Sequence, residues 1–402
     1  MRRWFVIGLI MVLTGCAAGP ETPVAPGADG SAKPPVPAPV EPQEPEKGEV
    51  LLASLEMIDE ESGWGLLRGH FGLVRTADGG QTWALVSPPG VDAPARAQLV
   101  ALTPLRAWLV EVREGPSGQR LLLHLTEDGG QGWERVELTT PFQSLYGASV
   151  SMVDERVGFL LAEGEHGSHS RPGALLRTDD GGRSWRLVAG PAEMPNAGKI
   201  RFESPQSGWV VGHQISTTPE RLAATQDGGR TWTEAQEWPL PEGFPPGQVS
   251  MESPPVQVGD RQLLIASFWP ESHRATEFRS LLYARKPSDD AWRLTAHLPH
   301  GPSSFLPDGH GWLWAGAPRD PGTKAPIAGQ LHLTADGGES WAIAEPDPTL
   351  QGLLDKGYNI GRLDFVTPET GWALLTAPGP YPPRLLRTTD GGRTWTILQP
   401  TS

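Results

Sequence analysis

The octapeptide TDDGGRSW at residues 178–185 recurs along the chain with small changes, and this repeat decides the fold. Further copies are TADGGQTW at 76–83, TEDGGQGW at 126–133, TQDGGRTW at 225–232, TADGGESW at 334–341 and TTDGGRTW at 388–395, and a worn seventh is RKPSDDAW at 285–292. The final tryptophans stand at positions 83, 133, 185, 232, 292, 341 and 395, so the period is near fifty residues. A steady period of this length is typical of a solenoid or a propeller.

A second signal lies about twenty residues before the final tryptophan of each octapeptide. It is an aromatic residue after a small one, at Gly63-Trp64, Ala107-Trp108, Gly158-Phe159, Gly208-Trp209, Ser267-Phe268, Gly311-Trp312 and Gly371-Trp372. An alternating segment such as KIRF at 199–202 comes before it. We assign the alternating segment to strand a, the small-aromatic pair to strand b, the run into the octapeptide to strand c and its tryptophan to the start of strand d.

The sequence therefore predicts an all-β fold, a seven-bladed β-propeller of four-stranded antiparallel blades over residues 49–402, with about 51 residues in each blade. No segment between the strands carries a helical period. The chain has 49 glycines and 42 prolines among 402 residues, which fits many tight turns and short strands. The repeats begin on strand a and finish on strand d, which favours ring closure without a strand exchanged between the chain ends. An added edge pairing by Val50-Leu51-Leu52 is the alternative, and the sequence does not decide between them.

Each octapeptide suits the hairpin between strands c and d. Its aspartate can accept hydrogen bonds from the backbone of its own turn, its glycine pair allows positive φ, and its tryptophan can pack between sheets. A catalytic acid does not recur at every turn, so we interpret these residues as structural. They are Asp78, Trp83, Asp128, Trp133, Asp180, Trp185, Asp227, Trp232, Asp336, Trp341, Asp390 and Trp395.

These octapeptides resemble the Asp box, or BNR repeat, of sialidases, sortilin-type receptors and related propellers. In those proteins the boxes are structural and lie away from the ligand face. The pairing of the box with the upstream Gly-Trp also resembles the photosystem II stability/assembly factor-like group, whose seven-bladed members are non-enzymatic and hold a membrane-protein partner. The resemblance implies a binding protein. The arginine patch of that group has no match here residue by residue, so the partner itself does not carry over.

The N-terminus, MRRWFVIGLIMVLTGC, combines Arg2 and Arg3 with an apolar run too short to span a bilayer. Its last four residues resemble a bacterial lipobox, and Cys16 is the only cysteine of the chain. We predict a signal peptide over 1–15, lipidation of Cys16 and a proline-rich tether over 16–48. The protein is then extracytoplasmic and anchored on the outer face of the bacterial cell membrane, or in the outer membrane of a diderm cell.

The composition of the chain argues against several classes of function and of site. Lys and Arg total 33 against 47 for Asp and Glu, a net charge of −14, which argues against a basic nucleic-acid surface. A single cysteine excludes an intramolecular disulfide and a cysteine-based zinc site. We expect no cofactor and no metal, because the His-x-x-His at His166 and His169 is a weak signal on a loop.

Because the boxes occupy the c–d turns, the b–c and d–a loops should build the functional face on the opposite side. The candidate binding residues on this face are His70, His166, His169, Arg171, His213, Trp269, His273, Trp314 and Tyr381. Three tryptophans, Trp238, Trp269 and Trp314, fall outside both repeated positions and are candidates for exposed contacts.

The predicted function is non-catalytic binding of an envelope or membrane protein, with the bilayer contacted only through Cys16. The alternative is a glycan-binding or sialidase-like glycoside hydrolase propeller. The chain lacks the Arg-Ile-Pro motif of sialidases, and its tyrosines have no recognisable glutamate partner. Carboxylates on or beside inner strands, namely Glu56, Glu203 and Asp364, are available, but the sequence does not show that any two converge on one pocket.

Overall fold

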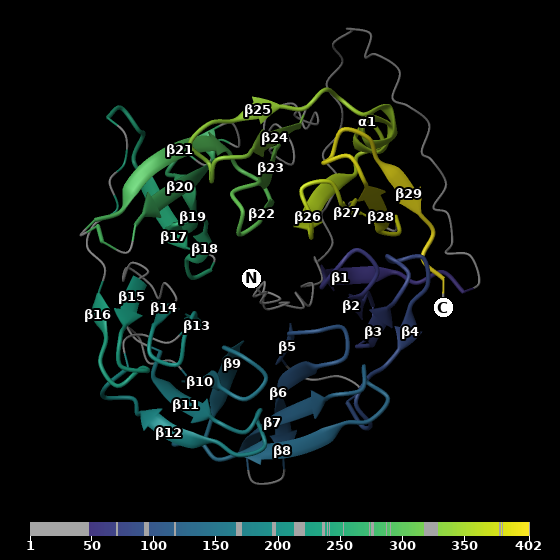
Figure 1. Cartoon of the computed structure of the whole chain (residues 1–402). Coiled ribbons are helices and arrows are strands. Elements are labelled where there is room, and N and C mark those ends of the chain that lie inside the picture. Colours follow the sequence, from purple (N-terminus) through teal and green to yellow (C-terminus); the bar gives the residue numbers. More distant parts are fainter. Residues whose placement is uncertain are drawn as a thin grey trace, which may run out of the picture.

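The computed structural model describes residues 48–401 except 70, 92–95, 116–117, 166–170, 195–197, 213–221, 235–237, 239, 241, 252, 273, 275–276, 287, 290, 317–328, 378 and 380. Seven antiparallel sheets form a ring in which each sheet is one blade (Figure 1). The predicted fold class is confirmed. None of the helices among the described residues is long and apolar enough to cross a membrane.

The blades follow one another in chain order, and the strands within each blade are adjacent in sequence. Blade 1 is β1 (Leu52–Met57), β2 (Gly63–Leu67), β3 (Leu73–Thr76) and β4 (Ala84–Leu85); blade 2 is β5 (Arg96–Ala101), β6 (Ala107–Gly115), β7 (Gly118–Thr126) and β8 (Glu134–Leu138); blade 3 is β9 (Leu145–Met152), β10 (Gly158–Gly164), β11 (Gly173–Thr178) and β12 (Arg186–Ala189); blade 4 is β13 (Gly198–Phe202), β14 (Gly208–Gly212), β15 (Leu222–Thr225) and β16 (Thr233–Glu234). Blade 5 is β17 (Gly247–Met251), β18 (Val256–Val258), β19 (Arg261–Pro270), β20 (Arg279–Arg285) and β21 (Arg293–Pro299); blade 6 is β22 (Ser303–Phe305), β23 (Gly311–Ala315), β24 (Gln330–Thr334) and β25 (Ala342–Ile343); blade 7 is β26 (Asn359–Phe365), β27 (Gly371–Thr376), β28 (Arg384–Thr388) and β29 (Thr396–Leu398).

Blade 5 departs from the four-stranded prediction because the extra strand β18 pairs with β19. A second departure is the helix α1 (Pro348–Leu354), between blades 6 and 7, where the sequence reading expected no helix. Asp347 caps α1 by accepting a hydrogen bond from the Leu350 N–H at 2.8 Å. Leu350 and Leu353 then pack into the core that blades 6 and 7 share. A helix of seven residues is too short to show a clear period, so its sequence signals were the capping Asp347 and Pro348 in its first turn.

The aromatic residue of strand b contacts the next blade at several junctions, and at three of them its indole donates a hydrogen bond to the next box. The Trp108 Nε1–H donates to the carbonyl of Gly181, the first glycine of the box in blade 3, at 2.8 Å. The equivalent bonds run from Trp312 to Gly391 and from Trp372 to Gly79, each at 2.9 Å. Blade 3 carries Phe159 in this position, and its ring stacks on Phe202 of blade 4 with centroids 3.5 Å apart.

The box tryptophans make a different bond. Those at 83, 185, 232, 341 and 395 donate Nε1–H to the second glycine of their own box at 2.9–3.1 Å. Trp133 instead donates to the Val86 carbonyl at the end of blade 1 at 2.9 Å. Five box tryptophans therefore stabilise their own turn, whereas Trp133 bonds across the junction between blades 1 and 2.

The ring closes through the two ends of the described chain. The Val50 N–H donates to the Pro400 carbonyl, and the Trp83 N–H donates to the Thr401 carbonyl, both at 2.8 Å. Arg384 of blade 7 pairs with Glu49 at 3.0 Å. β29 is the outer strand of blade 7 and pairs within that blade, so no strand is exchanged between the first and last blades. The ring is closed instead by the hydrogen bonds between the two chain ends.

We expect Trp372→Phe to lower the free energy of unfolding by about 2 kcal/mol, because the buried Gly79 carbonyl loses its donor while most of the ring volume stays. Denaturant unfolding measures this loss. Leu85→Ala is the control, since Leu85 is 68% exposed on β4 and should change stability by less than about 0.5 kcal/mol. Equal midpoints for Trp372→Phe and the unaltered protein would show that the junction does not depend on this bond.

Candidate functional site

In each Asp box, the aspartate carboxylate accepts hydrogen bonds from its own turn. The Asp180 Oδ1 accepts hydrogen bonds from the Thr178 hydroxyl at 2.8 Å and the Ser184 N–H at 2.9 Å, and its Oδ2 accepts the Ser184 hydroxyl. Desolvation raises the pKa of Asp180, but these hydrogen bonds outweigh it and bring the pKa to about 2. The carboxylate stays ionised at neutral pH and is committed to its own turn.

The hydrogen bonds also show which loops share a face. The first box glycine donates its N–H to a carbonyl in the a–b turn of the same blade, as Gly181 does to Arg156 and Gly391 to Glu369, each at 2.8 Å. The a–b and c–d turns therefore lie together on one face of the ring. The b–c and d–a loops lie at the other ends of the same strands, as the sequence predicts.

A polar ladder links the inner strands, and the sequence reading missed it. The penultimate residue of strand a accepts a hydrogen bond from the last residue of strand a in the next blade. Ser151 accepts from the Phe202 N–H at 2.9 Å, and Asp364 accepts from the Met57 N–H at 2.7 Å. The available signal was a polar residue directly before a terminal Phe or Met in several repeats.

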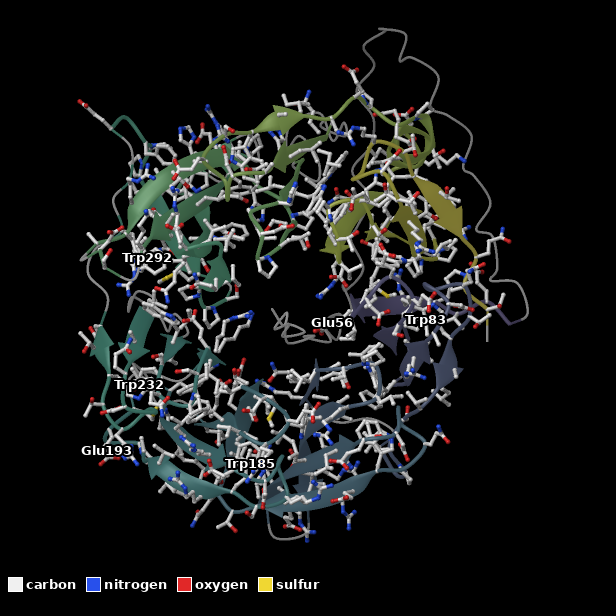
Figure 2. All side chains as sticks on the ribbon, in the orientation of Figure 1. Glu56, Trp83, Trp185, Glu193, Trp232 and Trp292 are labelled. Atoms are coloured by element: carbon white, nitrogen blue, oxygen red, sulfur yellow. The ribbon has the colours of Figure 1, made fainter. Side chains whose placement is uncertain are left out.

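Glu56 occupies the same ladder position in blade 1 and has no such bond. Its side chain is 0% exposed, and neither carboxylate oxygen has a hydrogen-bond partner among the described residues. Burial raises the pKa of Glu56 to about 8, with Arg362 opposing that rise and Asp364 adding to it. Glu56 is thus mostly protonated at neutral pH. Figure 2 places it on the inner side of the ring, with Trp83, Trp185, Trp232 and Trp292 farther out in the blades.

A cavity of about 970 Å³ lies at the centre of the ring, walled by blades 4 to 7. Its charged or titratable lining residues are Lys199, Arg201, Glu203, His300, Asp308, Arg362 and Asp364. The extra strand of blade 5 also contributes, through Val256 and Gln257. The cavity can therefore surround a ligand with fixed polar groups from four blades.

The candidate binding residues divide into three groups. His70, His166, His169, His213 and His273 lie outside the described residues. Within the described part of the chain, no three His, Cys, Asp or Glu side chains cluster as a metal site would require.

Arg171 and Trp314 are buried, at 7% and 3% exposure, against the expectation that they face solvent. Arg171 pairs with Glu163 at 3.1 Å and stacks on Tyr146, with Arg96 on the same ring. Trp314 belongs to the core beneath α1. Both side chains fold inward because a buried carboxylate or an apolar core is available to them.

Trp269 and Tyr381 form the third group. Tyr381 is half-buried and packs near Tyr358. Trp269 is 42% exposed at the b–c end of β19, with its ring centroid 5.1 Å from Phe278 and 5.6 Å from His300. The third tryptophan outside the repeats, Trp238, packs on Tyr283 and Trp292. Trp269 is thus an exposed aromatic side chain. Its neighbour His300 lines the cavity.

No protein-family model and no curated protein matches the chain. Among solved structures, the GH74 enzyme of Niastella koreensis is similar over 87% of this chain and 54% of its own, with 14% identity and a TM-score of 0.54. A prolyl endopeptidase matches 88% of this chain and 49% of its own, with 11% identity and a TM-score of 0.55. The chain spans about half the length of these two proteins.

A third similar structure is YCF48 bound to D1 peptide, which covers 88% of this chain and 84% of its own, with 19% identity and a TM-score of 0.45. The neighbours thus include both enzymes and a peptide-binding protein. At these identities the similarity establishes the propeller fold, and the ligand has to be argued from the side chains of this chain.

The raised pKa of Glu56 makes stability fall as pH rises. An unfolded glutamate ionises near pH 4.5, whereas folded Glu56 holds its proton to about pH 8, so the folded state loses stability across that window. We expect Glu56→Gln to remove about 3 kcal/mol of the stability difference between pH 5 and pH 7.5. Denaturant unfolding at both pH values measures this difference. Glu345→Gln, at an exposed carboxylate, should leave it unchanged; parallel pH profiles for Glu56→Gln and the unaltered protein would contradict the assignment.

Proposed function

We propose that the protein is a lipid-anchored, extracytoplasmic and non-catalytic propeller that binds an envelope protein through its b–c and d–a loops. The observation that carries this proposal is the division of the ring into two faces. On the box face, the polar groups of the boxes form hydrogen bonds within their own turns and with the a–b turns. The opposite ends of the strands bear the irregular b–c loops. The central cavity extends from the a–b turns at Glu203 and Asp308 to His300 in a d–a loop.

The anchor rests on the N-terminal sequence. Arg2, Arg3, an apolar run and Cys16 fall in the order of a lipoprotein signal. A proline-rich tether over 16–48 would let the ring reach a partner at some distance from the bilayer.

The inner carboxylates support a binding role over hydrolysis. A glycosidase needs two carboxylates that both reach the substrate in one pocket. Glu56 is fully buried, Asp364 accepts the Met57 N–H, and Glu203 is hydrogen-bonded by Gln262 at 3.1 Å. Each of these three carboxylates is therefore either hydrogen-bonded within the protein or buried from solvent. The glycoside hydrolase alternative therefore finds no free acid–base pair among them.

The proposal predicts a specific neighbour in the native membrane. Cross-linking of the full chain in its own membranes, followed by purification and mass spectrometry, should recover a reproducible envelope protein attached to b–c or d–a loops. Cross-links that fall mainly on the boxes, or a preparation without any protein partner, would contradict it.

Cys16→Ser separates the anchor from the binding. This variant should lose lipid labelling and leave the membrane fraction, while the purified ring keeps its affinity for the recovered partner. Membrane retention of Cys16→Ser would refute lipid anchoring without touching the binding face.

A further inference from the structure

The outer strands of the blades fall into two groups that differ in charge. Those of blades 2 to 5 expose the charged side chains Glu134, Arg135, Glu137, Arg186, Glu234 and Arg293. The outer strands of blades 6, 7 and 1, which are β25, β29 and β4, carry no charged residue. These three strands lie on the circumference of the ring (Figure 1), and together we call them the uncharged rim.

The uncharged rim exposes large apolar side chains. Each of its strands bears one of them two residues after the box tryptophan: Leu85, Ile343 and Ile397, which are 68%, 56% and 39% exposed. Blade 3 exposes Leu187 at the equivalent position, but the exposed Arg186 stands beside it. Charged side chains on an edge strand oppose association with other surfaces, and the uncharged rim lacks that protection.

The charges that flank the uncharged rim do not give it a sign. Glu345 follows β25 and Arg393 precedes β29, and these are the exposed charged residues closest in sequence to the two strands. Because they are of opposite sign, this sector stays close to neutral, whereas the whole chain has a net charge of −14.

The chain enters the ring within this sector. Glu49 pairs with Thr401, and Thr401 pairs with Thr82, so the first described residues lie between the end of blade 7 and the box of blade 1. Residues 1–47 precede this point in the sequence and include the predicted lipidation site, Cys16. The anchor therefore leads to the uncharged rim and away from the charged outer strands of blades 2 to 5.

A lipid anchor makes a weak contact at the rim effective. Once the chain is attached to a bilayer, contact between the rim and the lipid is intramolecular, and its strength depends on the effective concentration that the tether sets. Membrane association of apolar side chains scales with the apolar area that they bury. A few such side chains are then enough to orient an anchored ring, although they would not hold a free protein on the membrane.

We propose that the uncharged rim lies against the lipid surface to which Cys16 is attached, with Leu85 and Ile397 in the interfacial region of the bilayer. The ring then stands on its edge, and its b–c and d–a loops face along the membrane toward proteins in the same bilayer. This inference rests on the proposed lipid anchor and adds a second contact with the bilayer to that of Cys16.

Single fluorescent labels test the contact in the lipidated full chain. Cys16 is the only native cysteine and lipidation blocks its thiol, so a thiol-reactive dye marks only the cysteine introduced by Ala84→Cys, Thr396→Cys or Thr233→Cys. All three positions are exposed on outer strands, and Thr233 lies on β16 of blade 4. In phosphatidylcholine vesicles that contain a nitroxide-labelled lipid, we expect at least about threefold stronger quenching at positions 84 and 396 than at 233.

Charged substitutions on the rim should weaken the contact. Leu85→Asp is measured with the label at position 396 and Ile397→Asp with the label at position 84, so that the new carboxylate is not beside the dye. Each should lower quenching at least about twofold, because a carboxylate does not enter the lipid interface. Leu187→Asp is the matched control, since Leu187 is 55% exposed at the same repeat position and should leave quenching unchanged. An unchanged melting temperature checks that each variant folds.

Equal quenching at the three labels would overturn the proposal, as would quenching that Leu85→Asp and Ile397→Asp leave unchanged. A dimer of the detergent-solubilised protein that dissociates in both variants would assign the rim to a second copy of the chain and would also overturn it. Failure of the anchor is detected separately, because the dye would then label Cys16 of the unaltered protein. Failure of the protein partner is separate too, since cross-links to the b–c and d–a loops do not depend on the rim labels.

Discussion

The structure depends on a recurring contact between the aromatic residue of strand b and the next blade, which at three junctions is a hydrogen bond from the indole N–H to a glycine carbonyl of the box. That carbonyl points at the neighbouring blade because the two box glycines adopt positive φ, as Gly181 and Gly182 do at 77° and 99°. A side chain at either glycine would be strained in this conformation. The boxes of blades 1, 3 and 7 therefore present the same acceptor to the preceding blade in the ring, whereas the buried Trp64 Nε1 has no hydrogen-bond partner among the described residues.

This contact assigns the box turns to the stability of the ring and leaves the opposite ends of the strands for recognition. The box carboxylate, hydroxyls and glycines are engaged in the turn, and the polar ladder engages several inner-strand side chains. Among the described residues, the opposite ends of the strands show no repeated bond of this kind, so their sequences can vary without opening the ring. Blade 5 shows the consequence. In place of a regular box, Trp209, Arg285 and Trp292 hold the junction through an edge-to-face ring contact and a cation–π contact, and the blade contributes β18 to the cavity wall.

The sequence predicted the seven blades, their strand assignment and the face that carries the boxes, because these features repeat and each copy reinforces the others. It did not predict α1 or β18. Each occurs once and is too short to show a clear helical or alternating pattern. It also misplaced Arg171 and Trp314, since burial of a loop arginine depends on Glu163 and Tyr146, which are brought close only by the fold. The cavity depends on residues from four blades, and no spacing along the chain reveals that convergence.

Hydrogen–deuterium exchange of the full-length protein tests most directly whether the boxes and blade junctions hold the ring. The account predicts that peptides across the six intact boxes exchange slowest and nearly together, that the worn repeat at 285–292 exchanges sooner, and that the b–c loops exchange fastest. Box peptides that exchange as fast as the b–c loops, or a worn repeat as protected as the intact ones, would contradict it.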